Sequence, residues 1–391
     1  MPSTADPHAP LLRPDYDRSI VNLISSLTGS QALASEHYPP LAEFAALRPE
    51  GRPTLLLVID GLGYQWLQRF PDSFLHRHLA ARLTSVFPTT TAAAVTALAL
   101  GVAPQQHAIP GWFTYLREFG SVVMPLPFMP RGGQRSYAEQ GLAAADFLGA
   151  RALLPQLWRP VSVVQPAYIA TSSYSRALFG DVPRQPHQSL EQLFNQLQAA
   201  LASGDNPLVW GYWTELDALG HQYGIGSPEV EQHFRALDAG LAALAAELAG
   251  QDLLLVVSAD HGQVDTSPAE TVMLEQHPEL AALLQLPLCG EPRAAFCYLR
   301  HGCGAAFDQY LRSELPFLDS YPSAQLLAEG VFGRGEPSPL LAARIGDRVV
   351  LPRDRFVLRD RLVQERFHPM IGIHGGLSAE ELYVPLVICQ P

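Results

Sequence analysis

Four short, uninterrupted apolar runs constrain the fold of this chain more than any other feature. They lie at residues 54–59 (TLLLVI), 208–212, 253–257 and 382–388. A strand that is buried on both faces, as in a parallel sheet covered by helices, has this continuous pattern rather than an alternating one. Helical segments separate the runs, so the chain is expected to form an α/β fold with a doubly wound, mostly parallel sheet.

Helix start and stop signals support this alternation. Ser227 is suited to be the N-cap of a helix, Pro228 its first residue and Glu229 the acidic residue of its first turn. Gly250 is expected to end this helix. A further short strand is expected at 84–87, leading into a helix over 92–100 that ends at Gly101.

The 391 residues exceed the usual size of a single compact core. We interpret residues 1–391 as one discontinuous domain with two insertions above the carboxyl ends of the strands. Residues 1 to about 50 form a helical or irregular lead-in. The core is expected at about 51–112, 205–265 and 370–391, and the insertions at about 113–204 and 266–369.

Composition excludes several classes of function. The formal net charge of -12 argues against a surface that binds nucleic-acid backbones, although bound metal ions can still attract a small anionic substrate. None of the four cysteines has the CxxC spacing of a zinc or redox motif. The N-terminus lacks the pattern of a secretory signal and no segment is apolar for the length of a membrane span, so we expect a cytoplasmic protein that does not bind a membrane. Its oligomeric state is unknown.

Candidate metal ligands follow the apolar runs. Each lies at or shortly after the end of a run, in a glycine-rich segment: Asp60, Asp217, His221, Asp260, His261 and His374. Any one of them alone is better explained as a helix cap, a turn residue or a surface pair. Together they match the carboxylate and imidazole ligands that two zinc-like ions require when each keeps an open position.

Thr91 is the candidate nucleophile, because it lies where an expected strand meets a helix. A threonine there is often an N-cap, and capping is not excluded. A bound metal ion activates a hydroxyl, and a helix N-terminus favours an incoming phosphate. Thr89 and Thr90 remain open as alternatives.

The motifs resemble the alkaline phosphatase superfamily, most closely its type I phosphodiesterase/nucleotide pyrophosphatase family. The stretches that carry the resemblance occur in the family's order: LLLVIDGLG (55–63), SVFPTTTAAAVTALALGVAPQQHAIPGW (85–112), TELDALGHQYG (214–224), VVSADHGQV (256–264) and IHGGLSAEELYVPLV (373–387). They cover the expected core and little of the insertions.

The resemblance implies two zinc ions about 4 Å apart, with manganese as a possible substitute. Asp60, Asp260 and His261 would bind the ion that activates Thr91, which would itself be a ligand. The ligands of the second ion would be Asp217, His221 and His374.

The implied reaction is hydrolysis of phosphodiester or nucleotide pyrophosphate bonds of a small-molecule substrate through a covalent phospho-threonine. Alternatives are a phosphomonoesterase, a C–P hydrolase similar to phosphonoacetate hydrolase, and a metal-binding module without turnover. The family's diesterases usually carry an Asn three residues after the nucleophile, where this chain has Ala94.

Substrate specificity is expected to reside in the insertions. The first begins with aromatic residues about 20 residues beyond Thr91, and aromatic rings stack on nucleobases or enclose apolar groups. Each ring singly is more often part of a small core. We expect at least one of Trp112, Phe113 and Tyr115 to line the substrate pocket.

Overall fold

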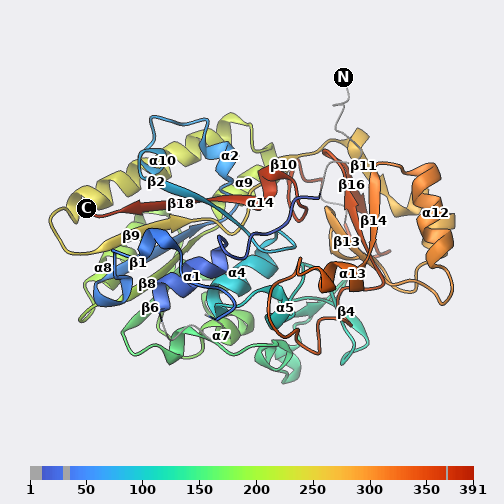
Figure 1. Cartoon of the computed structure of the whole chain (residues 1–391), viewed down its shortest axis with the longest axis horizontal. Coiled ribbons are helices and arrows are strands. Elements are labelled where there is room, and N and C mark those ends of the chain that lie inside the picture. Colours follow the sequence, from blue (N-terminus) through green and yellow to red (C-terminus); the bar gives the residue numbers. More distant parts are fainter. Residues whose placement is uncertain (1–10, 30–35, 367–368) are drawn as a thin grey trace.

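The computed structural model of the chain describes residues 11–29, 36–366 and 369–391. A seven-stranded sheet in the order β2-β18-β9-β1-β8-β6-β7 forms its centre (Figure 1). In that order the strands are β2 Leu79–Thr84, β18 Tyr383–Cys389, β9 Leu254–Ser258, β1 Thr54–Ile59, β8 Leu208–Trp213, β6 Val161–Pro166 and β7 Arg184–His187. All pairs are parallel except that β18 runs antiparallel to β9 and β2. The predicted mostly parallel α/β sheet is therefore confirmed.

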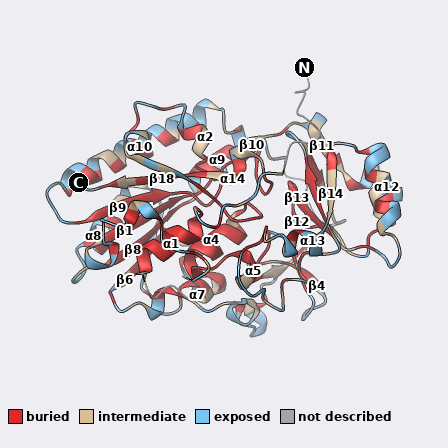
Figure 2. Ribbon diagram, viewed as in Figure 1, coloured by how far each residue is buried: buried red, intermediate tan, exposed pale blue. Residues whose placement is uncertain are grey.

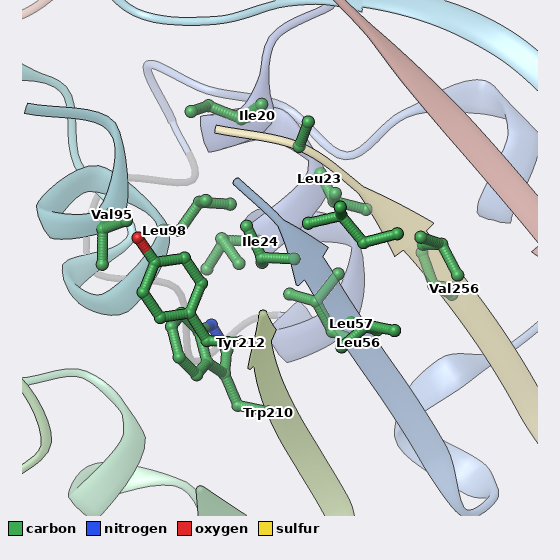
Figure 3. Close-up of a cluster of buried hydrophobic side chains, with 14 of the residues drawn as sticks. Ile20, Leu23, Ile24, Leu56, Leu57, Val95, Leu98, Trp210, Tyr212 and Val256 are labelled. Atoms are coloured by element: carbon green, nitrogen blue, oxygen red, sulfur yellow. The ribbon is translucent and has the colours of Figure 1, made fainter. Parts of the chain in front are cut away.

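Helices cover both faces of the sheet. One layer contains α1 (Ile20–Thr28), α4 (Thr91–Leu100) and α7 (Ser173–Phe179), and the other contains α8 (Leu190–Leu201) and α10 (Pro228–Glu247). In Figure 3, Ile24 of α1 and Leu98 of α4 lie in one cluster of buried side chains with Trp210 of β8. On the opposite face, a Cβ added at Gly211 would lie 3.0 Å from Leu197, so α8 packs closely against β8 there. The central strands β1, β8 and β9 are consequently buried at every position, as their continuous apolar runs predict (Figure 2).

A second body lies at the right of Figure 1. Its antiparallel sheet has the order β12 (Cys289–Glu291), β13 (Ala294–Cys297), β15 (Arg348–Pro352) and β14 (Leu318–Pro322), and it is accompanied by α12 (Gly304–Glu314). A small sheet of β3 (Thr114–Leu116), β4 (Ser121–Met124) and β5 (Met129–Pro130) lies beside it. The bridge between Phe113 and Gly290 joins the starts of these two regions.

The structure corrects the expected limits of the core. Strands β6 and β7 fall within 113–204, yet they extend the central sheet beyond β8. That range is therefore not an insertion throughout. Neither strand has a continuous apolar run, and each contains a proline, Pro166 or Pro186, which a strand near a sheet edge tolerates.

The strand expected at 84–87 is also wrong. The strand is β2, which ends at Thr84, and Val86 and Phe87 are buried in the turn that follows it. β2 is an edge strand with partly exposed positions, so it lacks a continuous apolar run. The described part of the lead-in contains α1, whose side chains pack into the core.

Within the described ranges, no helix combines the length and the apolar character that crossing a membrane requires.

Candidate active site

Parallel strands bring the candidate ligands to one edge of the sheet. Asp60 follows β1, and Asp260 and His261 follow β9, which pairs with β1 in register. Asp217 and His221 lie on α9 (Glu215–Tyr223), the helix that follows β8 on the other side of β1. His374 comes directly after β17 (Gly372–Ile373), which pairs with β10 (Val264–Asp265) just beyond β9. The six residues therefore meet because the carboxyl ends of neighbouring strands meet.

Asp60, Asp260 and His261 form a compact buried group. Their potential ligand atoms all lie within 4.8 Å of one another. His261 Nε2 is 3.4 Å from both Asp60 Oδ1 and Asp260 Oδ2. These two carboxylate oxygens are buried and accept no hydrogen bond. Because a buried charged oxygen without a partner is costly, the arrangement fits a cation bound between the three side chains.

Asp217, His261 and His374 form a second buried group, again with ligand atoms within 4.8 Å of one another. His221 lies beside it, with Nε2 3.1 Å from Asp217 Oδ2. The rings of His261 and His374 stack with centroids 3.8 Å apart. The two groups thus share His261, whereas the resemblance implied separate ligand sets, with His221 in the second.

Hydrogen bonds orient all three histidines in the same way. The Nδ1 atoms lie close to backbone carbonyls: His261 to Gly262 at 3.1 Å, His221 to Gly372 at 2.7 Å and His374 to Thr89 at 3.0 Å. A proton on Nδ1 that is donated to a carbonyl leaves Nε2 as the free lone pair. Metal-ligating histidines are commonly held by this kind of bond, so the tautomers suit metal binding.

The electrostatics of the six residues also fit a bound cation. Burial raises the pKa of Asp60, and the negative charges of Asp260 and Asp217 raise it further. Burial opposes the charge of His221, but Asp217 outweighs it and raises the pKa of His221 to about 9. The buried carboxylates therefore attract positive charge, which a divalent ion would supply.

The three candidate threonines have different surroundings. Thr91 is the first residue of α4, lines the central cleft, and has Oγ1 3.2 Å from His261 Nε2. Thr90 is the N-cap, but its hydroxyl donates to Glu291 Oε1 at 2.7 Å instead of capping the helix. The Thr89 hydroxyl donates to the carbonyl of Gly376 at 2.7 Å. Of the three hydroxyls, that of Thr91 is the one beside the ligand groups.

Ala94 is fully buried in the core and is not among the residues that line the cleft. An Asn at this position would point into the packed core. The first amides of α4 have no partner within the helix, so they can donate to an anion bound at its N-terminus.

Three residues that support the site were missed by the sequence argument. The hydroxyl of Tyr212 donates to Asp60 Oδ2, and the amide of Gln263 donates to Asp217 Oδ1. Both lie close in sequence to the predicted ligands, which is a usable signal. Glu291 lies in the second insertion and reaches Thr90 across 201 residues, so nothing local indicates it.

Close packing explains why the residue after Asp260 and His261 is a glycine, Gly262. A Cβ at this position would lie 2.0 Å from the carbonyl oxygen of Glu380, which precedes the last two residues of α14 (Ala379–Leu382). Only glycine allows the loop that carries His261 to pack this closely against α14.

A cleft of about 1140 Å³ opens over Thr91. Trp112 and Phe113 line it, and the guanidinium of Arg131 stacks over the Phe113 ring at 4.1 Å from its centroid. Trp112 is 37% exposed. Tyr115 is not among the lining residues and packs instead against Tyr298, with ring centroids 5.2 Å apart.

The fold and its family indicate a hydrolase of phosphoric ester bonds. The chain belongs to the type I phosphodiesterase/nucleotide pyrophosphatase family, which it matches over residues 54–325. The resemblance seen in the sequence motifs is thereby confirmed. No curated protein sequence matches the chain.

Solved structures with the same fold include two members of the ectonucleotide pyrophosphatase/phosphodiesterase group. Murine ectonucleotide pyrophosphatase/phosphodiesterase 5 is 17% identical with a TM-score of 0.64, and the match covers 86% of this chain and 87% of that one. The human protein of the same name is 16% identical with a TM-score of 0.65, and the match covers 87% of this chain and 88% of that one.

Phosphonoacetate hydrolase from Sinorhizobium meliloti, solved with phosphonoacetate, is a third structure with this fold. It is 18% identical with a TM-score of 0.63, and the match covers 87% of this chain and 90% of that one. At such identities these likenesses support the fold, whose mainly parallel sheet they share.

Proposed function

We propose that this protein hydrolyses phosphodiester or nucleotide pyrophosphate bonds of small molecules, with Thr91 as the nucleophile. The observation that carries the proposal is the position of Thr91 Oγ1, 3.2 Å from His261 Nε2 at the edge of the buried ligand groups. Two buried carboxylate oxygens that accept no hydrogen bond, on Asp60 and Asp260, belong to one of these groups. The family to which the chain belongs supports this class of reaction.

Two divalent ions are part of the proposal. Asp60, Asp260 and His261, with Thr91, would hold one, and Asp217, His221 and His374 the other. Nitrogen and carboxylate ligands suit zinc, and manganese can substitute at such sites. When bound, the ions would polarise the phosphoryl group and lower the pKa values of the Thr91 hydroxyl and of the attacking water.

The chain's own residues account for two displacements at phosphorus. In the first, Thr91 Oγ1 loses its proton and bonds to phosphorus while the bond to the leaving group breaks. The Thr91 ester keeps the substrate's other substituent. In the second, a water oxygen bonds to phosphorus, the bond to Thr91 Oγ1 breaks, and the threonine regains a proton. The N-terminal amides of α4 would stabilise the phosphoryl oxygens in both steps.

One neighbouring structure offers independent support. Murine ectonucleotide pyrophosphatase/phosphodiesterase 5 was also solved as an inactive threonine-to-alanine variant in complex with AMP. A threonine required for activity in the same fold agrees with a threonine nucleophile here. The bound AMP agrees with a small nucleotide product.

Thr91→Ala tests the nucleophile. The variant should retain close to two zinc-class ions per chain, measured by elemental analysis, and lose turnover by orders of magnitude. Acid-quenched wild-type enzyme should carry the substrate's phosphoryl group on the peptide that contains Thr91, and Thr90→Ala should still form this adduct. Near-wild-type activity in Thr91→Ala, or an adduct on Thr89 or Thr90, would refute the assignment.

A substrate panel tests the reaction class. Bis-p-nitrophenyl phosphate and thymidine 5′-p-nitrophenyl phosphate should be hydrolysed faster than p-nitrophenyl phosphate or phosphonoacetate, all with zinc present. Chelation should abolish all turnover and added zinc should restore it. A clear preference for the monoester or for phosphonoacetate would favour the corresponding alternative function.

A further inference from the structure

Glu291 is a buried carboxyl on the wall of the cleft that no step above requires. It is the last residue of β12, in the second body, and its side chain lines the same cleft as Thr91, Asp60 and His374. Only 8% of the residue is exposed. A carboxylate in such a position repels an anionic substrate, because its charge is poorly screened by solvent in the cleft wall.

The position of Glu291 is fixed by two hydrogen bonds to one of its oxygens. Oε1 accepts from the hydroxyl of Thr90 at 2.7 Å and from the backbone N–H of Trp112 at 2.6 Å. Thr90 precedes Thr91, so its Cα lies about 3.8 Å from that of the nucleophile. On the other side, the Cβ of Glu291 would be 2.5 Å from a Cβ added at Gly375, the residue after His374. The carboxyl is thus held between the nucleophile and the loop of a candidate ligand.

The second oxygen of Glu291 is available to the cleft. The hydrogen bonds to Glu291 from the described residues go to Oε1, and the positive charges of His221 and Arg359 also act on the carboxyl. Burial raises the pKa of this carboxyl to about 7, with the bonds from Thr90 and Trp112 opposing the shift. At pH 9 it is therefore ionised, and its charge lies in the wall of the cleft that Thr91 also lines.

We propose that Glu291 determines specificity by disfavouring dianionic phosphate monoesters relative to monoanionic phosphodiesters at Thr91. The inference rests on the proposed function, and it identifies Glu291 as the residue that makes the enzyme prefer diesters to monoesters. A diester has one negative charge on its phosphoryl group and a monoester has two at alkaline pH. Repulsion from a carboxylate in the wall of the same cleft therefore acts more strongly on the monoester. For one extra charge in a partly solvated cleft, the expected discrimination is about tenfold or more.

Glu291→Gln is the matched test. Glutamine keeps an oxygen at Oε1 that can accept from Thr90 and Trp112, and it removes the charge. At pH 9 the ratio of kcat/KM for bis-p-nitrophenyl phosphate to that for p-nitrophenyl phosphate should fall about tenfold, mainly because the monoester reacts faster. Glu380→Gln removes an exposed charge from α14, outside the cleft, and should leave the ratio unchanged.

A binding measurement separates this inference from the proposed function. Inorganic phosphate is mostly dianionic at pH 9, and calorimetry on the zinc-loaded proteins should show about tenfold tighter binding to Glu291→Gln than to wild type. Unchanged phosphate affinity, with metal content preserved, would overturn the role of Glu291 even if the wild type is a diesterase. If Glu291→Gln binds phosphate more tightly but the wild type hydrolyses no diester, the role of Glu291 in repelling dianions is supported and the proposed function is refuted.

Discussion

A buried ion pair between Arg293 and Glu381 links the second body to the loop that carries His374, and its removal should be strongly destabilising. The two side chains are 2% and 0% exposed, and Arg293 Nη2 donates to Glu381 Oε2 at 2.8 Å. Glu381 Oε1 also accepts from the backbone N–H of Gly376, at 2.8 Å, two residues after His374. The perturbation is Arg293→Met, which keeps an apolar stem but leaves Glu381 buried without a cation.

The expected loss follows from this geometry. Removing one partner of a buried, hydrogen-bonded ion pair costs about 3–5 kcal/mol, because the remaining charge stays desolvated. Burial alone would raise the pKa of Glu381, but Arg293 outweighs it and lowers that pKa below its usual value. A carboxyl whose pKa is depressed by folding contributes stability above its unfolded pKa, and this contribution is lost as the pH falls through the folded pKa. The deficit of Arg293→Met should therefore be largest at neutral pH and shrink in acid.

The assay is urea unfolding at pH 7.5, followed by tryptophan fluorescence at a fixed zinc concentration, since bound metal adds its own stabilisation. Arg334→Met is the control, because Arg334 pairs with Asp17 at the surface, where the side chains are 42% and 62% exposed. An exposed pair of this kind contributes about 1 kcal/mol or less. If Arg293→Met is no less stable than Arg334→Met, the reasoning is wrong.

Two further predictions concern the pocket and the response to acid. Trp112→Ala and Phe113→Ala should lower kcat/KM for thymidine 5′-p-nitrophenyl phosphate more than for bis-p-nitrophenyl phosphate. Tyr115→Ala should not, because Tyr115 packs against Tyr298 instead of lining the cleft; equal losses on both substrates for all three would remove this segment from the binding site. Burial lowers the pKa of His107 to about 3, so the unfolded chain binds a proton below about pH 6.5 that the folded chain does not. This difference in proton binding should lower the free energy of unfolding by about 2 kcal/mol as the pH is lowered from 6.5 to 5. His107→Asn, which can still accept from the N–H of Ile109, should reduce that slope in urea unfolding measured at several pH values, and an unchanged slope would show that other groups cause it.

The sequence determined the central strands and the residues at their ends. Continuous apolar runs such as 54–59 and 253–257 arise because a strand covered on both faces has no solvent-facing position for a polar side chain. Asp60, Asp260 and His261 follow such strands directly, so their meeting at one edge could be inferred once the strands were taken as parallel neighbours. Local patterns failed for β2, β6 and β7, which lie at or near the edges of the sheet, where burial is incomplete and proline is tolerated.

Only the tertiary structure decided how the supporting groups meet at the site. Thr89, Thr90 and Thr91 have the same chemistry in sequence, and their roles differ because Gly376 and Glu291 take up two of the hydroxyls while Thr91 is left beside His261. The same holds for Tyr115, whose ring is turned toward Tyr298 by packing. The physical reason is that burial and backbone geometry leave a periodic record in the chain. A contact such as that between Thr90 and Glu291 joins residues 201 positions apart and depends on how two regions distant in the sequence pack together.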